Sequence, residues 1–383
     1  MSFQDIYYVG VNDHEIDLFE GQYRVPHGMS YNSYVIVDEK TAVIDSVDAR
    51  FAAPWLEQIR RVLGQRQPDY LVIQHMEPDH SGSLMAFMEA FPSAALVTSA
   101  RALVMIKNFF GTDFAQRQLI VGEGDSLPLG EHCLNFITAP MVHWPEVIMS
   151  YESREKVLFS ADAFGKFGAL DVEEDWVSEA RRYYIGIVGK YGAPVQAVLK
   201  KAAALEIQKI CPLHGPVLEE NLGDYLALYD GWSRYEAEEK GIVIAYTSVY
   251  GNTRKAVLQL AEMLGKNQKV VVYDLARCDM AAAVADAFRF SKLVLATTTY
   301  CGDMFPFMRE FIDHLKDRGF SRRTVAFVEN GSWAPVAARL MKAMLEKCKE
   351  LRFVEAEVCI RSALNEESAA QLRELAEALG EAD

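Results

Sequence analysis

Short apolar runs alternate with helix-like patterns throughout residues 241–383, and this alternation restricts the fold more than any other feature of the chain. Parallel strands need a crossover connection, usually a helix, so the pattern predicts a doubly wound parallel sheet with helices on both faces. The five runs expected to form its strands are Ile242–Tyr246, Val270–Tyr273, Leu293–Thr297, Val325–Val328 and Val354–Ile360. We therefore predict a five-stranded α/β domain over residues 241–383.

The first 140 residues have a different pattern, in which Gly, Pro, Asn and Asp separate short apolar runs. Such spacing predicts a β-rich layered domain. Its expected strands include Ser33–Val37, Ala42–Asp45, Tyr70–Ile73, Ala95–Thr98, Asn135–Ile137 and Ile207–Cys211. Helices are expected near Ala53–Leu63 and Ser83–Phe91 and over residues 174–206. We place the domain boundary near residue 240 and expect Tyr225–Lys240, where Gly and Pro are sparse, to be a bridging helix.

Composition and charge exclude some cellular compartments and some classes of binding partner for this protein. The chain has 39 basic and 54 acidic side chains and a net charge of −15, a field that repels nucleic acid and anionic membranes. Its first residues lack the features of a signal peptide, and no stretch approaches the roughly 18 apolar residues of a membrane span. The six cysteines include no C-x-x-C pair, which excludes a rubredoxin-type iron site or zinc ribbon. We expect a soluble, cytoplasmic protein.

Side chains of the type that bind metals crowd the segment His75–His80, directly after a predicted strand. Two of the chain's eight histidines lie there among carboxylates, and Pro78 lowers the entropy lost when the loop is ordered. Farther along, His143, Asp162 and His214 each follow an apolar run and lie at a turn. A single loop histidine is more often satisfied by a hydrogen bond, but the whole set predicts a metal centre.

The order H-x-E-x-D-H, followed by H, D and H at loop ends, resembles the metallo-β-lactamase fold as flavodiiron proteins use it. The segment Ser30–Val37, followed by Ala42–Asp45, is similar to the opening strands of that family. The resemblance covers nearly the whole chain. It implies a metallo-β-lactamase-like αββα sandwich with a bridged pair of iron ions over residues 1–240, followed by a flavodoxin-like FMN-binding domain over residues 241–383.

The resemblance also implies which residues bind the two iron ions. His80 stays outside this set, because many flavodiiron proteins leave that position unbound. Zinc hydrolases of the fold usually carry a second histidine at Glu77, and the carboxylate makes the donor set harder and better suited to iron. The implied ligands are His75, Glu77 and His143 for one ion, Asp79 and His214 for the other, and Asp162 as the bridge.

Three loops at the expected carboxyl ends of parallel strands resemble the FMN loops of flavodoxins. The first has no Lys or Arg, but backbone N–H groups, a helix N-terminus and the hydroxyls of Ser248 and Thr253 can hold a phosphate. Tyr300 and Trp333 are able to stack on the flavin ring. Each loop alone is equally consistent with an ordinary βα turn. The residues expected to contact FMN are Ser248, Val249, Tyr250, Gly251, Asn252, Thr253, Thr298, Thr299, Tyr300, Cys301, Gly302, Asn330, Gly331, Ser332, Trp333 and Ala334.

Electron counting connects the two cofactors. Reducing dioxygen to two waters takes four electrons and coupling two nitric oxides to nitrous oxide takes two, while a diferrous pair and a reduced flavin hold two each. The resemblance implies an oxygen or nitric oxide reductase, fed by a small electron carrier such as rubredoxin or by a reductase. It also implies a head-to-tail homodimer or a tetramer. His27 and Tyr184 are candidates to line the metal pocket, although a turn histidine and a buried tyrosine are equally good interpretations. The sequence does not distinguish Tyr184 from its neighbour Tyr183 for this role.

Two other functions compete with this interpretation. The first is a zinc hydrolase of the metallo-β-lactamase fold with a regulatory flavin domain, against which Glu77 argues. The second is a flavodoxin-like electron carrier or redox sensor whose first domain is a degenerate scaffold. Three carboxylates that converge without a cation have no physical reason to persist in a scaffold, which argues against the second.

Overall fold

The computed structural model describes residues 4–381. The chain folds into two compact units, Met1–Asp230 and Gly231–Asp383, so the division lies earlier than the predicted residue 240. The predicted helix over Tyr225–Lys240 is wrong in its extent, because α7 spans Leu222–Ser233 and strand β16 already starts at Glu239. Tyr235 has a φ of +60°, a left-handed conformation that an α-helix does not continue through.

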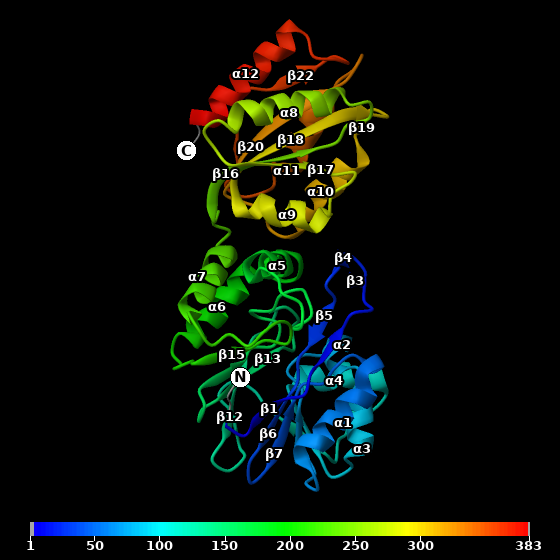
Figure 1. The fold of residues 1–383 in the computed structure, drawn as a ribbon, viewed down its shortest axis with the longest axis vertical. Helices are drawn as coiled ribbons and strands as arrows, with labels where there is room; N and C mark the ends of the chain where they lie inside the picture. The colour runs from blue at the N-terminus through cyan, green and yellow to red at the C-terminus, as the bar shows by residue number, and fades with distance from the viewer. Residues whose placement is uncertain (1–3, 382–383) are drawn as a thin grey trace. The chain divides into compact units, whose positions relative to one another are not determined.

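Two β-sheets form the centre of the first unit (Figure 1). The first sheet has the order β1-β6-β7-β8-β9-β10, antiparallel up to β7 and parallel from there on. Its strands are Ile6–Tyr8, Tyr34–Val37, Thr41–Ile44, Tyr70–Val72, Ala95–Thr98 and Gln118–Ile120. Four of the predicted strands therefore lie side by side in this sheet.

The second sheet has the order β11-β12-β13-β14-β15 and is antiparallel except for its last pair. Its strands are Ser126–Pro128, Cys133–Thr138, Ile148–Glu152, Val157–Phe159 and Lys209–Cys211. Apolar side chains from both sheets form one buried cluster, to which the first sheet gives Ile36 and Val72 and the second gives Phe136 and Phe159. Removing these side chains from water is the main force that holds the two sheets together.

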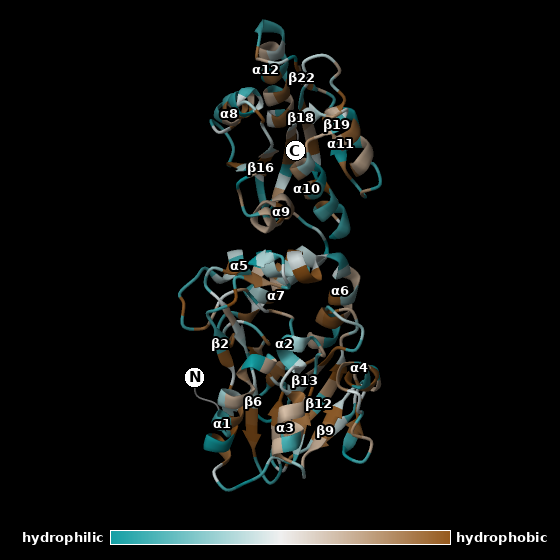
Figure 2. Cartoon of the chain, turned by 90° about the vertical axis from the view of Figure 1, so that its right-hand side faces the viewer, coloured by the Kyte–Doolittle hydropathy of each residue, from teal (hydrophilic) through white to brown (hydrophobic). Residues whose placement is uncertain are grey.

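Helices cover the outer faces of this sandwich, and the strands β6, β9 and β12 are largely brown in Figure 2, which marks them as hydrophobic. On the side of the first sheet are α1 (Ala52–Leu63), α3 (Leu84–Ala90) and α4 (Ala100–Phe110). On the side of the second sheet, α6 (Gly192–Ala202) adjoins β12, where Lys201 Nζ donates to the Thr138 carbonyl at 2.8 Å. This is the predicted αββα arrangement.

Short elements near the carboxyl ends of the strands complete the first unit. Two hairpin-like pairs are β2 (Val11–Asp13) with β5 (Met29–Tyr31) and β3 (Leu18–Phe19) with β4 (Tyr23–Arg24). The predicted helical stretch over residues 174–206 is divided into α5 (Trp176–Tyr183), a π-helical segment (Tyr184–Val188), a 3-10 turn (Gly189–Tyr191) and α6. The remaining short helices are α2 (Pro78–Ser81) and a 3-10 turn at Ala49–Phe51.

The second unit contains one parallel sheet, with the strand order β17-β16-β18-β20-β21 and β22 also paired to β20. This is the 2-1-3-4-5 order of flavodoxin-like folds. Of the fifth predicted strand, Val354–Ile360, only the last three residues form a strand, β22, and the two-residue β21 lies just before the predicted range. The strands are β16 (Glu239–Tyr246), β17 (Val270–Asp274), β18 (Phe290–Tyr300), β20 (Thr324–Asn330), β21 (Arg352–Phe353) and β22 (Val358–Ile360), with the short β19 (Asp303–Met304) antiparallel to β18.

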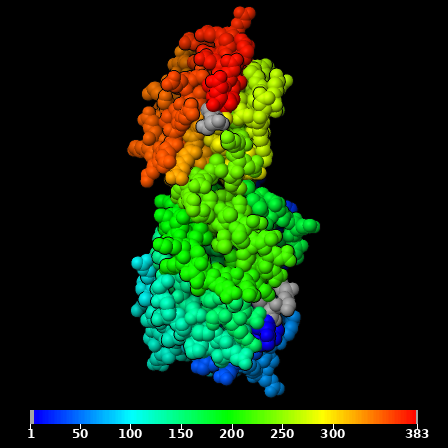
Figure 3. All heavy atoms as spheres, turned by 90° about the vertical axis from the view of Figure 1, so that its left-hand side faces the viewer, coloured from blue at the N-terminus to red at the C-terminus, as the bar shows by residue number. Residues whose placement is uncertain are grey.

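Helices lie on both faces of this sheet, as the alternation predicted. One face packs against α8 (Asn252–Leu264) and α12 (Glu366–Glu381), whose leucines share a buried cluster with β16, β18 and β20. Figure 3 shows α12, in red, at the surface of this unit. The other helices are α9 (Met280–Arg289), α10 (Pro306–Asp317) and α11 (Ala337–Leu345). Within residues 4–381, no helix is long and apolar enough to cross a membrane.

Candidate functional site

The predicted metal ligands come from loops that follow strands of the first unit. His75 and Glu77 lie in the segment after β8, and helix α2 carries Asp79 and His80. This helix starts at Pro78, which suits a first helical position because its fixed φ is helical and no hydrogen bond is lost there. The loops after β12, β14 and β15 supply the other predicted ligands, which are His143, Asp162 and His214.

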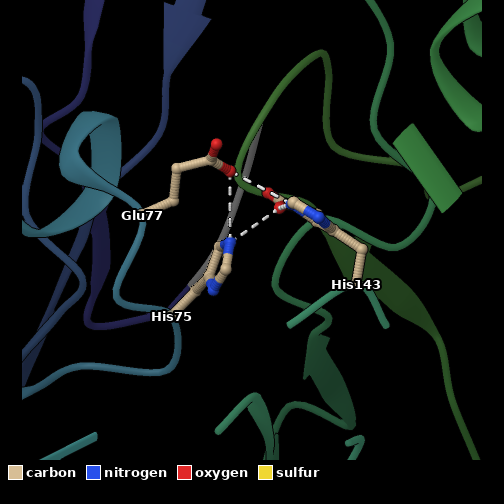
Figure 4. A group of neighbouring side chains, drawn as sticks. His75, Glu77 and His143 are labelled. Atoms are coloured by element: carbon tan, nitrogen blue, oxygen red, sulfur yellow. Dashed lines mark hydrogen bonds and ion pairs between the residues drawn. The ribbon is translucent and has the colours of Figure 1, made fainter. Parts of the chain in front are cut away.

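Four of these side chains form one group. Nε2 of His75 lies 3.3 Å from Oε2 of Glu77 and 3.2 Å from Oδ2 of Asp162. Nε2 of His143 lies 3.1 Å from the same Glu77 oxygen and 3.0 Å from the same Asp162 oxygen. The three labelled side chains in Figure 4 point toward one another. Ligands about 2.1 Å from one ion lie about 3 Å apart, so these distances are those of a coordination shell.

Asp79, His80 and His214 form a second group. Nε2 of His80 lies 3.2 Å from Oδ2 of Asp79 and 3.0 Å from Nε2 of His214, and Nε2 of His214 lies 3.3 Å from that Asp79 oxygen. Two ring nitrogens that face each other at 3.0 Å share either a proton or a metal ion. His80, which the sequence interpretation left outside the ligand set, therefore faces the same point as the two predicted ligands.

The Asp162 carboxylate lies between the two groups. Its Oδ2 belongs to the first group, and its Oδ1 lies 3.3 Å from Nε2 of His80 and 3.7 Å from Nε2 of His214. Both carboxylate oxygens of Asp162 and both of Asp79 are buried, and the groups described at 3.0–3.7 Å from them are imidazole nitrogens, which are themselves potential metal ligands. Buried carboxylates are costly without a hydrogen bond or a cation, so this pattern fits metal ions bound on both sides of Asp162.

Electrostatics keep the Asp162 carboxylate ionised even without a metal. Burial alone would raise the pKa of Asp162, but the imidazoles of His75, His143 and His80 hold it well below its usual range. The same contacts act on the rings: burial would lower the pKa of His143, but Asp162 and Glu77 raise it to about 9. In the metal-free protein, carboxylates and imidazolium rings thus hold one another in place.

Two orienting partners of the imidazoles were not found from the sequence. Oε1 of Glu146 lies 2.8 Å from Nδ1 of His75 and accepts the backbone N–H of Met76 at 2.9 Å. The carbonyl of Ser30 lies 2.7 Å from Nδ1 of His214. A partner at Nδ1 fixes the ring and leaves Nε2 as the ligand atom. In the sequence, only the position of Glu146 three residues after His143 points to a role at the site.

The segment Ser30–Asn32 holds the loop that carries His214. Nδ2 of Asn32 donates to the carbonyls of Pro212 and Gly215 at 2.8 and 2.7 Å, and the N–H of Gly215 donates to Oγ of Ser30 at 2.8 Å. Both polar side chains are fully buried. The motif that carried the family resemblance in the opening strands therefore has a direct structural role at the site.

Tyr183, rather than the predicted Tyr184, faces the ligand groups. Its ring centroid lies 5.5 Å from that of His214, and burial together with the nearby carboxylates raises its pKa well above the usual range, so its hydroxyl keeps its proton. The ring of Tyr184 packs on Tyr229, with centroids 5.0 Å apart. A π-helical segment starts at Tyr184, and such segments are frequent at functional sites.

His27, the other predicted pocket residue, belongs to neither ligand group. Its side chain is 54% exposed, and Nε2 lies 3.7 Å from Oε1 of Glu174. Glu20, at the tip of the β3–β4 hairpin, lies close enough to Glu77 for the two carboxyl groups to affect each other's charge. Burial and the charge of Glu77 raise the pKa of Glu20 to about 7.

The three loops predicted to bind FMN meet at the carboxyl end of the parallel sheet. Oγ1 of Thr253 lies 3.3 Å from Oγ1 of Thr298, and Nδ2 of Asn330 donates to the same Thr253 oxygen at 3.3 Å. Asn330 also donates to the carbonyl of Ser362, which adds a fourth loop that the sequence did not indicate. Ligands of open α/β sheets bind at this edge, so the loops are placed to hold one together.

The first of these loops is open at the start of α8. Gly251 has a φ of +89° and precedes the helix, and a Cβ there would meet no atom within 4 Å. Oγ of Ser248 accepts the N–H groups of Gly251 and Arg254 at 3.1 and 3.3 Å. Tyr250 and Trp333 are 93% and 90% exposed, so both rings are open to contact with a ligand.

Comparison with known proteins agrees with this architecture. A family model described as "ODP family beta lactamase" matches residues 29–215. The anaerobic nitric oxide reductase flavorubredoxin of Vibrio vulnificus is 30% identical over 343 residues, which are 86% of this chain and 69% of that protein.

Two solved structures show the same fold over the whole chain. The flavodiiron protein of Giardia intestinalis is 26% identical, with a TM-score of 0.87 over 98% of this chain and 95% of that one. The rubredoxin oxygen:oxidoreductase of Desulfovibrio gigas is 24% identical, with a TM-score of 0.91 over 98% and 96% of the two chains.

Fold and site together define a two-part α/β protein. A metallo-β-lactamase-like domain carries two adjoining groups of metal-binding side chains, and a flavodoxin-like domain follows it. The chain belongs to the flavodiiron protein family, and it is an oxidoreductase.

Proposed function

We propose that the protein reduces dioxygen to water, nitric oxide to nitrous oxide, or both, at a bridged pair of non-haem iron ions that receive electrons through FMN. The observation that supports this most is the Asp162 carboxylate, whose two oxygens face different ligand groups. A shared carboxylate suits two metal ions roughly 3.5–4 Å apart, a separation at which a diatomic molecule can be held between them. The name of the Vibrio relative supports nitric oxide as a substrate.

The donor set supports iron as the metal. Oxygen donors are hard ligands that favour oxidised iron, and the two groups offer three carboxylates beside four imidazoles. We propose to add His80 to the set, because its Nε2 lies as close to Asp162 and His214 as a ligand atom would. The full proposed set is His75, Glu77 and His143 on one ion, Asp79, His80 and His214 on the other, and Asp162 shared between them.

Protein groups around the ions have separate roles in the proposed reaction. The Tyr183 hydroxyl is a neutral hydrogen-bond donor beside the second group, and it is suited to orient a bound diatomic or to deliver a proton. Aromatic rings exclude bulk water: Phe19 lies 5.3 Å from His214, and Trp144 lies 5.2 Å from His75, between ring centroids. Low water content strengthens each charge interaction within the site.

The flavodoxin-like domain is proposed to bind FMN through the loops that contain Thr253, Thr298 and Asn330. The phosphate would lie at the N-terminus of α8, and the exposed rings of Tyr250, Tyr300 and Trp333 would cover the flavin. Reduced FMN and a ferrous pair, when bound, supply two electrons each. We further propose a small donor such as rubredoxin, a head-to-tail homodimer and, from the six free cysteines, a reducing compartment such as the cytoplasm.

Cofactor content and gas reduction test the proposal directly. Protein produced with ample iron is expected to contain about two iron ions and one FMN per chain, as the two ligand groups and one set of loops require. After anaerobic reduction, mixing with dioxygen is expected to reoxidise all four electrons without releasing peroxide, and mixing with nitric oxide is expected to yield nitrous oxide. Stopped-flow absorbance, a peroxide assay and gas chromatography measure these outcomes.

Other results would favour the competing functions. Two zinc ions per chain with esterase or thioesterase turnover would support a zinc hydrolase with a regulatory flavin domain. Slow reoxidation of the flavin alone, with no bound metal, would support an electron carrier. Either result would overturn the proposed reductase.

Replacing Glu146 by glutamine tests the orientation of His75. The amide can present an N–H to Nδ1 of His75 and so favour the wrong tautomer, and we expect metal affinity to fall by about 10–100-fold with the fold intact. Chelator competition measures affinity, and circular dichroism checks the fold. Glu89→Gln, exposed on α3, is the matched control. An unchanged affinity would mean that the 2.8 Å contact does not orient the ring.

A further inference from the structure

A cavity of about 850 Å³ lies in the second unit, at the edge of the parallel sheet where its strands start. The FMN loops follow the other ends of the same strands, and along β18 Lys292 lies roughly 20 Å from Thr298. The cavity is therefore separate from the proposed flavin site. Its walls include basic residues at or just before the starts of four strands, which are Lys240 at β16, Lys269 at β17, Lys292 at β18 and Arg352 at β21.

Strand pairing places two of these cations in one row across the sheet. Lys292 on β18 pairs with Thr324 on β20, and Thr324 pairs with Arg352 on β21. Residues paired in register point to the same face of a sheet, so the side chains of Lys292 and Arg352 lie on one face with Thr324 between them. This is the face covered by α12, because Nζ of Lys292 donates to the Leu379 carbonyl on that helix at 2.7 Å.

The lining of the cavity is strongly basic, although the whole chain has a net charge of −15. Six of the lining residues are basic, and only Glu350 is acidic. One of the six, Arg323, turns its guanidinium to the Tyr235 carbonyl at 2.7 Å, so five basic side chains are left for the cavity. A cleft lined by charges of one sign focuses the electric field within it. The cavity can therefore attract a small anion that the chain as a whole repels.

Ion pairs within the chain compensate only part of this charge. Nε of Arg322 lies 3.1 Å from Oε2 of Glu350, and Nζ of Lys269 lies 2.8 Å from Oε2 of Glu239. Arg352 is exposed, and within residues 4–381 its side chain forms no ion pair. Its guanidinium is thus available to a ligand in the cavity.

The groups in this row suit a phosphate. An ammonium, a hydroxyl and a guanidinium supply several N–H and O–H donors, and bonds from cationic donors to phosphate oxygens are strong. The cavity also has an apolar side, formed by Met263, Leu264 and Ala376. Its volume of about 850 Å³ exceeds what inorganic phosphate needs and is typical of pockets for organic ligands.

We propose that this cavity binds a phosphorylated organic molecule of nucleotide size. Its phosphates contact the row of Lys292, Thr324 and Arg352, and its organic part packs against the apolar side. The site is additional to the proposed gas reduction and does not depend on the metal pair.

Calorimetric titration of the full chain, saturated with FMN so that the flavin loops are filled, tests the proposal. The probes are ADP, pyrophosphate and adenosine, which separate the charge from the organic part. We expect ADP to bind at one site per chain, pyrophosphate to bind about 10-fold more weakly, and adenosine to show no binding at the same concentrations.

Variants assign the binding to the cavity. Arg352→Gln and Lys292→Gln are each expected to weaken ADP binding by about 10-fold or more, because each removes a charge-assisted hydrogen bond. Arg339→Gln, exposed on α11 after the carboxyl end of β20, is the matched control and should bind ADP as the parent does. Thermal unfolding checks the fold of K292Q, because Lys292 is only 9% exposed. The exposed Arg352 provides a second variant that packing does not affect.

Four results would overturn the assignment. A parent chain that does not bind ADP would exclude a phosphorylated ligand of this size. ADP binding that R352Q and K292Q both leave unchanged would place the nucleotide outside this cavity. Pyrophosphate binding as tight as that of ADP would show that the apolar side takes no part and that the site accepts only small anions. Adenosine binding as tight as that of ADP would exclude recognition of the phosphates.

Discussion

Asp162→Asn is expected to leave the protein with at most one firmly bound metal ion. The rate of dioxygen or nitric oxide reduction is expected to fall by at least about 100-fold. The carboxylate offers one oxygen to each ligand group, at 3.0–3.3 Å from the nitrogens of His75, His143 and His80. An amide keeps the size but offers one weakly basic oxygen, and its N–H group would face ring nitrogens that must bind a metal. The loss therefore affects both ions at once, unlike the loss of an outer ligand.

Metal analysis and single-turnover reoxidation measure the effect of Asp162→Asn. Asp69→Asn is the matched control, because the Asp69 carboxylate accepts the Thr41 N–H at the start of β7, far along the sheet from the ligands. The control should bind two ions as the parent does. If D162N retained both ions and most of its activity, the shared carboxylate would not bridge the pair, and the assignment of the two groups to one centre would be wrong.

The fold could be predicted from the sequence because its strands obey local rules. The runs Tyr70–Ile73 and Ala95–Thr98 are apolar, β-branched and bounded by turn residues, and they form β8 and β9. In the second domain, each strand and the helix that follows it reveal one βα unit. Prediction failed where a single backbone angle decided the outcome, as at Tyr235, whose left-handed φ lies beyond the end of α7.

The metal ligands could be predicted because their spacing is a motif, whereas their partners come from distant loops. Glu146 reaches His75 through the course of the chain in space, and its position three residues after His143 is the one sign of it in the sequence. Tyr183 and Tyr184 are adjacent, and the π-helical segment that starts between them shifts the phase of the helix, so a 3.6-residue period does not tell which one faces the metals. The role of His80 as a candidate ligand became visible only from the 3.0 Å distance between its Nε2 and that of His214.

Removal of the metals is expected to make the protein less stable at pH 9.5 than at pH 6, while the metal-loaded protein keeps its stability over this range. Without metal, the contacts of His143 with Asp162 and Glu77 raise its pKa from 6.5 to about 9. Those of His75 and His80 with carboxylates raise their pKa values as well. A group whose pKa is higher in the folded state stabilises the fold fully below the unfolded pKa, and this contribution is lost as the pH rises through the folded value.

The expected size follows from the His143 shift. A rise from 6.5 to about 9 corresponds to about 3 kcal/mol, or a fall of roughly 10 °C in the unfolding midpoint of a domain of this size. Calorimetry at pH 6, 7.5 and 9.5, on chelator-treated and metal-loaded protein, measures it, and the metal-free variant His143→Asn should lose much of the slope. Bound metal replaces the protons on the rings, so its affinity should strengthen over the same pH range. An equal loss of stability in the loaded and metal-free forms would show that the imidazoles are not exchanging protons for metal, and the ligand set would then need revision.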